Sequence, residues 1–319
     1  MVARFDTITV SEDGADRVRV SGARGEPAPE DLKVCINYVG GHRNSMTFVL
    51  NGLDIERKAE VALRLLWDRL GDPSQFAECD VRLIRADHED ATTIEGASAF
   101  LRVTVKDPDG DKVGRRFSNA VTELALASYP GFTMTSPPSD GTVYGVYWPA
   151  LVPADVVEHR VVLPDGSSIV VPHSKPTPGT EVVAARAPEA LTTDGPTARA
   201  PLGRLFGARS GDKGGNANLG VWARDARAFA WLAREMTVER IKDLIPEAAE
   251  LVVQRYDLPN LWALNFVLVG FLGEGVSSST RFDPQAKALG EFWRSRVVDL
   301  PVSLLDAENV RDVQPRNGT

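Results

Sequence analysis

The sequence predicts an α/β region followed by a small α+β sandwich, and three observations lead to this fold class. The 319 residues are too many for one small core and favour two domains. Hydrophobic residues make up 43% of the chain and charged residues 25%, a balance typical of globular proteins that excludes extended disorder. Segments with the two-residue period of strands alternate with segments of helical period, which indicates a mixed fold.

The first region, residues 1–172, is predicted to alternate between strands and helices. Segments 7–10 and 17–20 alternate in polarity, and the turn residues 12–14 between them predict a hairpin. A helix is expected to begin at the cap residue Asp54 and to end at Gly71, because the apolar residues between them recur at helical spacing. A second helix is expected over 114–128. Further strands are expected at 32–39, 81–84, 100–105, 156–163 and 168–171.

A proline-rich segment, residues 173–201, has no lasting periodicity and is predicted to be an extended linker. The second domain, 202–303, is expected to begin with strand 202–207 and a glycine-rich loop. Strands follow at 219–222, 251–256 and 262–269, with helices over 225–236 and 237–244 and a last helix that has Pro284 at its first position. This order predicts a ferredoxin-like sandwich with helices on one face. Residues 304–319 are expected to form a flexible tail.

Charge and composition exclude several classes of protein. The net charge of -8 disfavours nucleic-acid binding. The first residues lack the apolar run of a signal peptide, and the most apolar later run, 261–272, is too short to cross a bilayer. We therefore expect a cytoplasmic protein without a membrane partner. Cys35 and Cys79 are too few for a disulfide framework and are expected to be buried thiols.

Common catalytic signatures are missing from the sequence. The four histidines at 42, 88, 159 and 173 do not have the spacing of metal ligands. The chain also lacks the Gly-x-Ser-x-Gly motif of hydrolases and the Gly-x-Gly-x-x-Gly motif of dinucleotide sites. We expect neither a metal nor a dinucleotide cofactor.

The segment 208–218 combines glycines, asparagines and charges and is the strongest candidate for a site. Its backbone N–H groups can form an anion-binding nest, and its cations would add charge. The residues expected to bind substrate here are Arg209, Lys213, Gly214, Gly215, Asn216 and Asn218. Asp212 would hold one of the cations or act as a catalytic base. The alternative is a tight structural turn with solvated charges.

The segment 273–281 is a second candidate, because its hydroxyls, glycines and Arg281 suit a carboxylate or phosphate. Ser277, Ser278 and Arg281 are expected to bind substrate here, and we expect this loop to converge with the first. The alternative is a serine-rich loop with a solvated Arg281.

In the first region, paired glycines precede His42, Arg43 and Asn44, which predicts a pocket for an oxyanion or a thioester carbonyl. His42 would be catalytic, and Arg43 and Asn44 would bind substrate; alternatively, His42 is a surface residue. The run 129–149 is crowded with aromatic residues and prolines. It would wall an apolar pocket, or serve as a rigid packing segment or subunit interface.

Long strings of this sequence resemble acyclic terpene utilisation AtuA-type proteins. Segment 209–218 resembles the hallmark of their closing ferredoxin-fold domain, and segments 275–279 and 283–285 match its second hallmark. The larger domain that precedes it is resembled by segments 37–41 with 43–45, 105–108, 129–132, 135–138 and 144–153. The resemblance covers about 280 residues.

The resemblance also implies a function. Members of this family typically carry a few hundred further residues ahead, so residues 1–172 correspond to the carboxy-terminal part of the α/β domain. We expect either one half of a split protein or a form for which the front part is dispensable. The family is associated with the breakdown of citronellol and geraniol through coenzyme A thioesters and biotin-dependent carboxylation.

Two hypotheses follow from the resemblance. The first is a lyase or hydratase component that acts on a branched, carboxylated acyl thioester or a related hydroxy acid, with coenzyme A only as part of the substrate. The second is a non-catalytic subunit that completes the domain of a separately encoded partner. Either implies a homo-oligomer, or a hetero-oligomer with an amino-terminal half, and leaves open whether this chain is an enzyme by itself.

Overall fold

The computed structural model describes residues 2–26, 29–173 and 195–306. The chain forms two compact units, which we call the central unit (residues 37–146) and the terminal unit (residues 1–36 and 147–319). Both combine strands with helices, which confirms the predicted mixture of α/β and α+β structure. Among the described residues, no helix is long and apolar enough to span a membrane.

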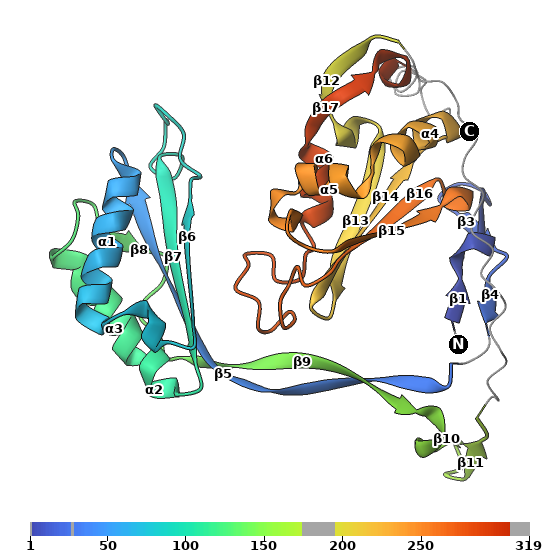
Figure 1. The fold of residues 1–319 in the computed structure, drawn as a ribbon, viewed down its shortest axis with the longest axis horizontal. Coiled ribbons are helices and arrows are strands. Elements are labelled where there is room, and N and C mark those ends of the chain that lie inside the picture. Colours follow the sequence, from blue (N-terminus) through green and yellow to red (C-terminus); the bar gives the residue numbers. More distant parts are fainter. Residues whose placement is uncertain (1, 27–28, 174–194, 307–319) are drawn as a thin grey trace. The chain divides into compact units, whose positions relative to one another are not determined.

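The central unit is built on a sheet with the strand order β6–β7–β5–β8, and β9 pairs with β5 as well. The strands are β5 (Asp31–Asn51), β6 (Glu78–Ile84), β7 (Ser98–Asp107), β8 (Thr133–Met134) and β9 (Thr142–Pro153). The helices are α1 (Ile55–Leu70), α2 (Gly110–Val113) and α3 (Arg115–Glu123). Helices α1 and α3 cover one face of the sheet (Figure 1).

The core of the central unit follows from the alternation of β5. Met46, Phe48 and Leu50 are fully buried against the helices, because successive side chains of a strand point to opposite faces. Helix α1 occupies the predicted span and ends before Gly71, whose φ of 99° suits a glycine. The predicted cap is wrong: Asp54 has a left-handed φ of 57° and its side chain caps no N–H group.

The terminal unit contains a four-stranded antiparallel sheet with the order β13–β14–β16–β15. Its strands are β13 (Phe206–Lys213), β14 (Asn216–Ala223), β15 (Val253–Leu258) and β16 (Ala263–Leu268). Its helices are α4 (Ala226–Glu235), α5 (Val238–Leu244) and α6 (Leu289–Ser295). Leu219, Phe266 and Trp293 of α6 are fully buried in one core, so the helices cover one face of this sheet.

Helix ends in the terminal unit test the predicted caps. Asp225 accepts a hydrogen bond from the Ala228 N–H at 2.9 Å, and Thr237 accepts one from the Arg240 N–H at 3.1 Å, which confirms both helix starts. The predicted start of the last helix at Pro284 is wrong, because α6 begins at Leu289. Ala286 has a φ of 52°, which interrupts a right-handed helix.

In the described part of the terminal unit, four two-stranded sheets accompany this larger sheet. They pair β1 (Val2–Arg4) with β4 (Arg24–Glu26), β2 (Thr9–Glu12) with β3 (Val18–Ser21), β10 (His159–Val162) with β11 (Ser168–Val171), and β12 (Thr197–Pro201) with β17 (Val297–Pro301). The β2–β3 pair confirms the predicted hairpin. Strand β12 uses the last residues of the predicted linker; residues 174–194 of that linker and 307–319 of the predicted tail lie outside the described residues.

Candidate functional site

The predicted glycine-rich loop is a β-hairpin. Strand β13 continues to Lys213, which pairs with Asn216 at the start of β14, so the turn consists of Gly214 and Gly215 alone. Gly214 has a φ of 64°, as the first central residue of a type II′ turn requires. The expectation that the strand ends at Gly207 is wrong, because the ladder with β14 runs through every residue from Phe206 to Lys213.

Strand geometry separates the charged residues that the sequence places together. Ser210 and Asp212 lie on the face covered by α6, where the Ser210 hydroxyl accepts a hydrogen bond from the Gly290 N–H at 2.8 Å. Arg209 and Lys213 lie on the opposite, helix-free face, because side chains alternate along a strand. The structure therefore places Asp212 on the opposite face of the strand from Arg209 and Lys213. A ligand held by those two cations would not lie beside Asp212, the expected base.

A third cation joins this strand from a distant part of the chain. The Lys287 Nζ lies 3.3 Å from the Asp212 Oδ1 atom and 3.1 Å from the position that a Cβ would take at Gly211. We call Arg209, Lys213 and Lys287 the β13 cation cluster. Arg209 and Lys213 flank Gly211 on one face and are exposed. Sequence reasoning missed Lys287, since it lies 75 residues from Asp212 and belongs to no recognisable motif.

The two predicted asparagines have different roles. The Asn216 side chain accepts a hydrogen bond from the Gly270 N–H at 2.9 Å and so ties the hairpin to the loop after β16. The Asn218 amide on the helix-free face exchanges two hydrogen bonds with the Asn265 amide, at 2.8 and 3.0 Å. Of the two predicted asparagines, Asn218 therefore has its amide on the sheet surface that also carries Arg209.

The hairpin turn packs against the second predicted segment. The Gly215 carbonyl accepts a hydrogen bond from the Leu272 N–H at 2.9 Å, and a Cβ at Gly215 would lie 2.1 Å from the Gly273 carbonyl oxygen. The two segments are thus in contact within the terminal unit. Ser278 is buried and donates a hydrogen bond to Glu274 at 3.2 Å, and Ser277 lies in the same turn.

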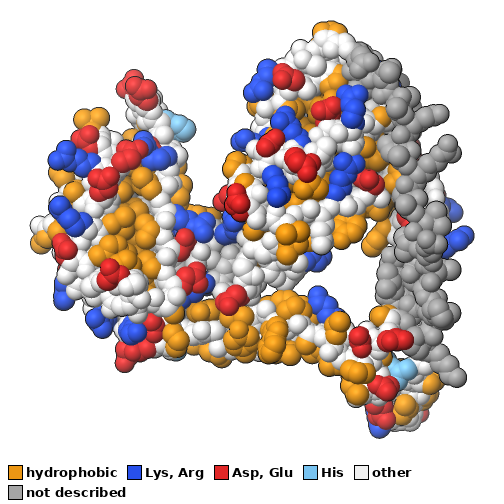
Figure 2. Space-filling view, viewed as in Figure 1, with side chains coloured by type: hydrophobic (Ala, Val, Ile, Leu, Met, Phe, Trp, Pro, Cys, Tyr) orange, Lys and Arg blue, Asp and Glu red, His pale blue; other side chains and the backbone are white. Residues whose placement is uncertain are grey.

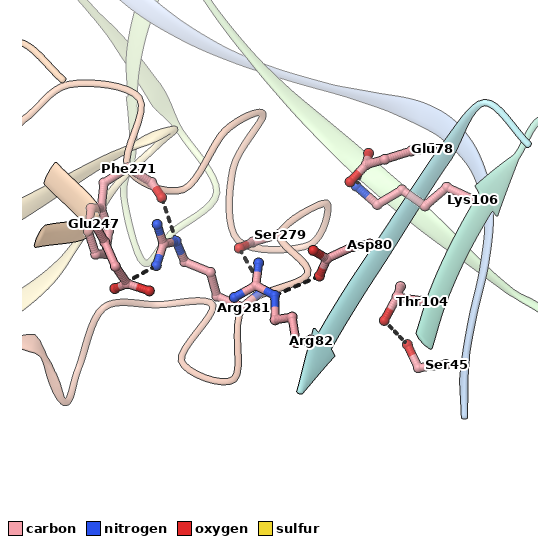
Figure 3. Close-up of polar contacts among 10 residues, drawn as sticks. All are labelled: Ser45, Glu78, Asp80, Arg82, Thr104, Lys106, Glu247, Phe271, Ser279 and Arg281. Atoms are coloured by element: carbon pink, nitrogen blue, oxygen red, sulfur yellow. Dashed lines mark hydrogen bonds and ion pairs between the residues drawn. The ribbon is translucent and has the colours of Figure 1, made fainter. Parts of the chain in front are cut away.

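Arg281 is held by its own loop and by the segment after α5. Its Nε donates to the Phe271 carbonyl at 2.8 Å, and its Nη1 lies 2.9 Å from the Glu247 carboxylate (Figure 3). The guanidinium also lies 3.9 Å from the centre of the Phe271 ring. These contacts occupy the guanidinium, so the expected role of Arg281 in binding an anion would compete with Glu247.

His42, Arg43 and Asn44 are consecutive on β5 and do not converge. The buried Asn44 amide donates to the Ser139 carbonyl at 2.9 Å and accepts from the Ser45 N–H at 2.8 Å. The His42 Nδ1 lies 3.2 Å from the Pro108 carbonyl oxygen. Arg43 is on the opposite face from Asn44, so strand alternation prevents the single pocket that the sequence suggested.

The helix-free face of the central sheet carries a grid of polar side chains that we call the polar sheet face. Three rows run across β6, β7 and β5 in register. The rows are Glu78–Lys106–Arg43, Asp80–Thr104–Ser45 and Arg82–Arg102–Thr47. Of these residues, sequence reasoning selected Arg43 alone. The signal that could have found the six residues of β6 and β7 is a polar residue at every second position of 78–82 and 102–106.

Hydrogen bonds and ion pairs join the members of the polar sheet face (Figure 3). The Ser45 and Thr104 hydroxyls lie 2.8 Å apart at the centre of the grid. Lys106 contacts Glu78 at 2.7 Å, and Arg82 contacts Asp80 at 2.7 Å.

Positive charge dominates this face. Burial lowers the pKa of Arg102, and the charges of Arg82 and Arg43 lower it further, against the opposing effect of Asp80. Four cations face two carboxylates, so the grid carries a net charge of +2. Such a field favours an anion, and no group of His, Cys, Asp and Glu in the described ranges could hold a metal ion.

The chain thus combines a mixed α/β unit with a unit that contains an antiparallel sheet, and comparisons with known proteins match segments of both. The model of the acyclic terpene utilisation family protein AtuA matches residues 1–163. The model of the AtuA ferredoxin-like domain matches residues 200–299. The chain belongs to the acyclic terpene utilisation AtuA family, which confirms the resemblance. No curated protein and no solved structure matches the chain.

Proposed function

We propose that the protein is a component of a lyase or hydratase that acts on a branched, carboxylated acyl thioester or a related hydroxy acid. The family supplies the context of acyclic terpene utilisation. The observation that supports an anionic substrate is the β13 cation cluster, in which three cations surround a glycine on an edge strand.

The cluster suits either the phosphates of the coenzyme A part or the carboxylate of the acyl part of a carboxylated acyl-coenzyme A thioester. Gly211 has no side chain, so an anion can approach the strand between Arg209 and Lys213. Lys287 adds a third donor from the edge, and Asp212 holds it in place from the other face. Charge-assisted hydrogen bonds of this kind also stabilise negative charge that develops on an enolate or carboxylate during reaction.

The test is calorimetric titration of the full chain with coenzyme A and with its branched carboxylated acyl thioesters. Removal of one cation in Arg209→Ala, Lys213→Ala or Lys287→Ala should weaken binding by roughly 1.5–3 kcal/mol, the range for a charge-assisted hydrogen bond. Arg234→Ala is the matched control, because Arg234 pairs with Glu235 on α4 and is half exposed. Asp212→Asn should weaken binding less than the loss of a cation does, because Asp212 affects the ligand only through its ion pair with Lys287.

Unchanged affinity in all three cluster variants, with ordinary thermal unfolding, would show that the cluster binds no substrate. Turnover of the thioester by the purified chain would make it an enzyme in its own right. If thioester binds and the chain lacks turnover with every partner tested, the lyase or hydratase role is wrong.

A second function, a non-catalytic subunit that completes a partner's domain, is favoured by the ribbon that β5 and β9 form. Strand β9 contains no charged residue, and hydrophobic side chains gather along this ribbon (Figure 2). Val39, Val143, Trp148 and Leu151 are between 58 and 69% exposed. Exposed apolar strands are favourable only when another surface covers them.

Sedimentation and co-purification distinguish this subunit from a self-sufficient protein. We expect a homo-oligomer or a complex with a larger α/β partner, and Trp148→Ser with Leu151→Ser should dissociate it. Leu126→Ser is the control, because Leu126 is fully exposed but lies outside the ribbon. A stable monomer that binds no co-expressed partner would exclude the subunit role.

A further inference from the structure

We infer that Tyr147 is a positioning residue for the β13 cation cluster, because it holds the hairpin turn that directly follows Lys213. This role rests on the function proposed above, since Lys213 is one of the cations expected to bind the acyl thioester. Three segments of the terminal unit meet at Tyr147: the hairpin turn, the loop after β16 and strand β5.

The ring of Tyr147 lies against the backbone of the hairpin turn. A Cβ at Gly214 would lie 2.5 Å from the Tyr147 Cε1 atom and 2.8 Å from its Cδ1 atom, so the ring occupies the space that a side chain at Gly214 would need. Gly214 follows Lys213 in the chain and has a φ of 64°. Close packing one residue from the cation restricts the direction in which the Lys213 side chain leaves the strand.

The main chain of Tyr147 holds the loop after β16. Its N–H donates to the Glu274 carbonyl at 3.0 Å, and a Cβ at Gly275 would lie 3.0 Å from the Tyr147 Cβ atom. The hairpin turn packs on the same loop, because Gly215 lies against the Gly273 carbonyl. Tyr147, the turn and the loop therefore each contact the other two, so the loss of one member should loosen the remaining pair.

The hydroxyl of Tyr147 contacts strand β5. It lies 3.4 Å from the Cys35 Sγ atom, and the Lys33 Nζ atom lies 5.8 Å from the centre of the ring. Cys35 and Lys33 are both exposed, so water competes for the hydroxyl and its hydrogen bond adds little free energy. The ring, which packs on Gly214, should therefore provide most of the positioning.

The cations of the cluster are held by different groups. Lys287 comes from the segment before α6, and its Nζ lies 3.3 Å from the Asp212 carboxylate, on the face of β13 that the helix covers. Lys213 follows the strand to its end and depends on the turn for its position. A change at Tyr147 should therefore remove the contribution of Lys213 to anion binding and leave that of Lys287.

The experiment is calorimetric titration of the full chain with coenzyme A. Tyr147→Ala should weaken binding about tenfold, as the loss of one charge-assisted hydrogen bond would, whereas Tyr147→Phe keeps the ring and should bind like the unmodified protein. In the Tyr147→Ala background, Lys213→Ala should cause little further loss, and Lys287→Ala should keep its full effect. Tyr256→Ala is the matched control, because Tyr256 is half exposed and its hydroxyl donates to Gln254 at 3.0 Å on β15, the opposite edge of the sheet.

A purely structural tyrosine gives a different pattern. Independent residues change the binding free energy additively, so additive losses in Tyr147→Ala and Lys213→Ala would overturn the inference. An equal loss in Tyr147→Phe or in Tyr256→Ala would overturn it as well. Thermal unfolding identifies a variant that does not fold, and Tyr147→Leu then replaces Tyr147→Ala.

Hydrogen exchange of the ligand-free chain separates this role from the proposed function. The Leu272 N–H donates to the Gly215 carbonyl, so its exchange reports whether the turn stays on the loop. It should be faster in Tyr147→Ala than in Tyr147→Phe and the unmodified chain. If the unmodified chain binds no coenzyme A, the proposed function fails, and faster exchange still supports Tyr147 as the residue that holds the turn. Unchanged exchange in Tyr147→Ala would overturn the positioning role, whatever the chain binds.

Discussion

A methyl group at Gly215 tests whether the glycines of the hairpin turn serve packing or ligand binding. The Cβ of Gly215→Ala would lie 2.1 Å from the Gly273 carbonyl oxygen, far inside contact distance and against backbone that cannot rotate away. Relief requires the hairpin to move from the loop after β16, which breaks the 2.9 Å bond between the Leu272 N–H and the Gly215 carbonyl. Overpacking costs about 1–3 kcal/mol and the lost hydrogen bond about 0.5–1.5 kcal/mol.

We therefore expect Gly215→Ala to reduce the free energy of unfolding by roughly 2–4 kcal/mol, measured by urea denaturation. Gly220→Ala is the matched control on β14, because the nearest atom to its Cβ would be the Arg209 carbonyl oxygen at an ordinary 3.7 Å. It should be neutral or stabilising by about 0.4–1 kcal/mol, since alanine restricts the unfolded chain. Equal stability of the two variants would refute the packing role and favour a turn that is free to bind a ligand.

Three further predictions concern thiols, acid stability and the core. The expected burial is wrong for Cys35, which is exposed, whereas Cys79 is half-buried. Cys35 should therefore react quickly with a thiol reagent at pH 8 and Cys79 slowly, because burial and then the charges of Asp80 and Glu78 raise the pKa of Cys79 to about 11. Cys35→Ser should remove the fast phase. Burial acts to raise the pKa of Asp107, but its N–H donors and Lys112 outweigh that effect and lower the pKa. The contribution of Asp107 to the free energy of unfolding is therefore present above about pH 4 and is lost as the pH falls through the lowered pKa. Asp107→Asn should flatten the dependence of the free energy of unfolding on pH between about pH 5 and pH 2. Trp293 is fully buried, and its indole N–H has no acceptor among the described residues. Trp293→Ala should lower the free energy of unfolding by roughly 3–5 kcal/mol, and Trp293→Phe should lower it far less, as measured by thermal unfolding.

Local signals were sufficient for much of the secondary structure. Helix α1 could be predicted because its apolar residues repeat at helical spacing, and Asp225 and Thr237 mark helix starts through bonds within four residues. Local sequence signals gave the wrong prediction where backbone hydrogen bonds to a neighbouring strand determine the conformation. Glycines in 208–215 suggested a loop, but the ladder to β14 supplies hydrogen bonds that hold the segment extended to Lys213.

The composition of the candidate site was partly evident from the sequence, but its arrangement was not. Arg209 and Lys213 could be selected from the sequence as cations near glycines. That they lie on the opposite face of β13 from Asp212 became evident only when this segment proved to be a strand. The two amino-acid hallmarks and the family were contained in the sequence alone, because they depend on residue identity and order.

Tertiary structure alone decided which distant residues meet. Lys287 reaches β13 across 75 residues, and the polar sheet face joins Arg43, Asp80 and Thr104 from three strands. Polar alternation within each strand predicts that one face is polar, yet it contains no information on the register between strands. A shift of one residue would turn Thr104 away from Ser45, and that register is fixed by the packing of Met46 and Phe48 against the helices.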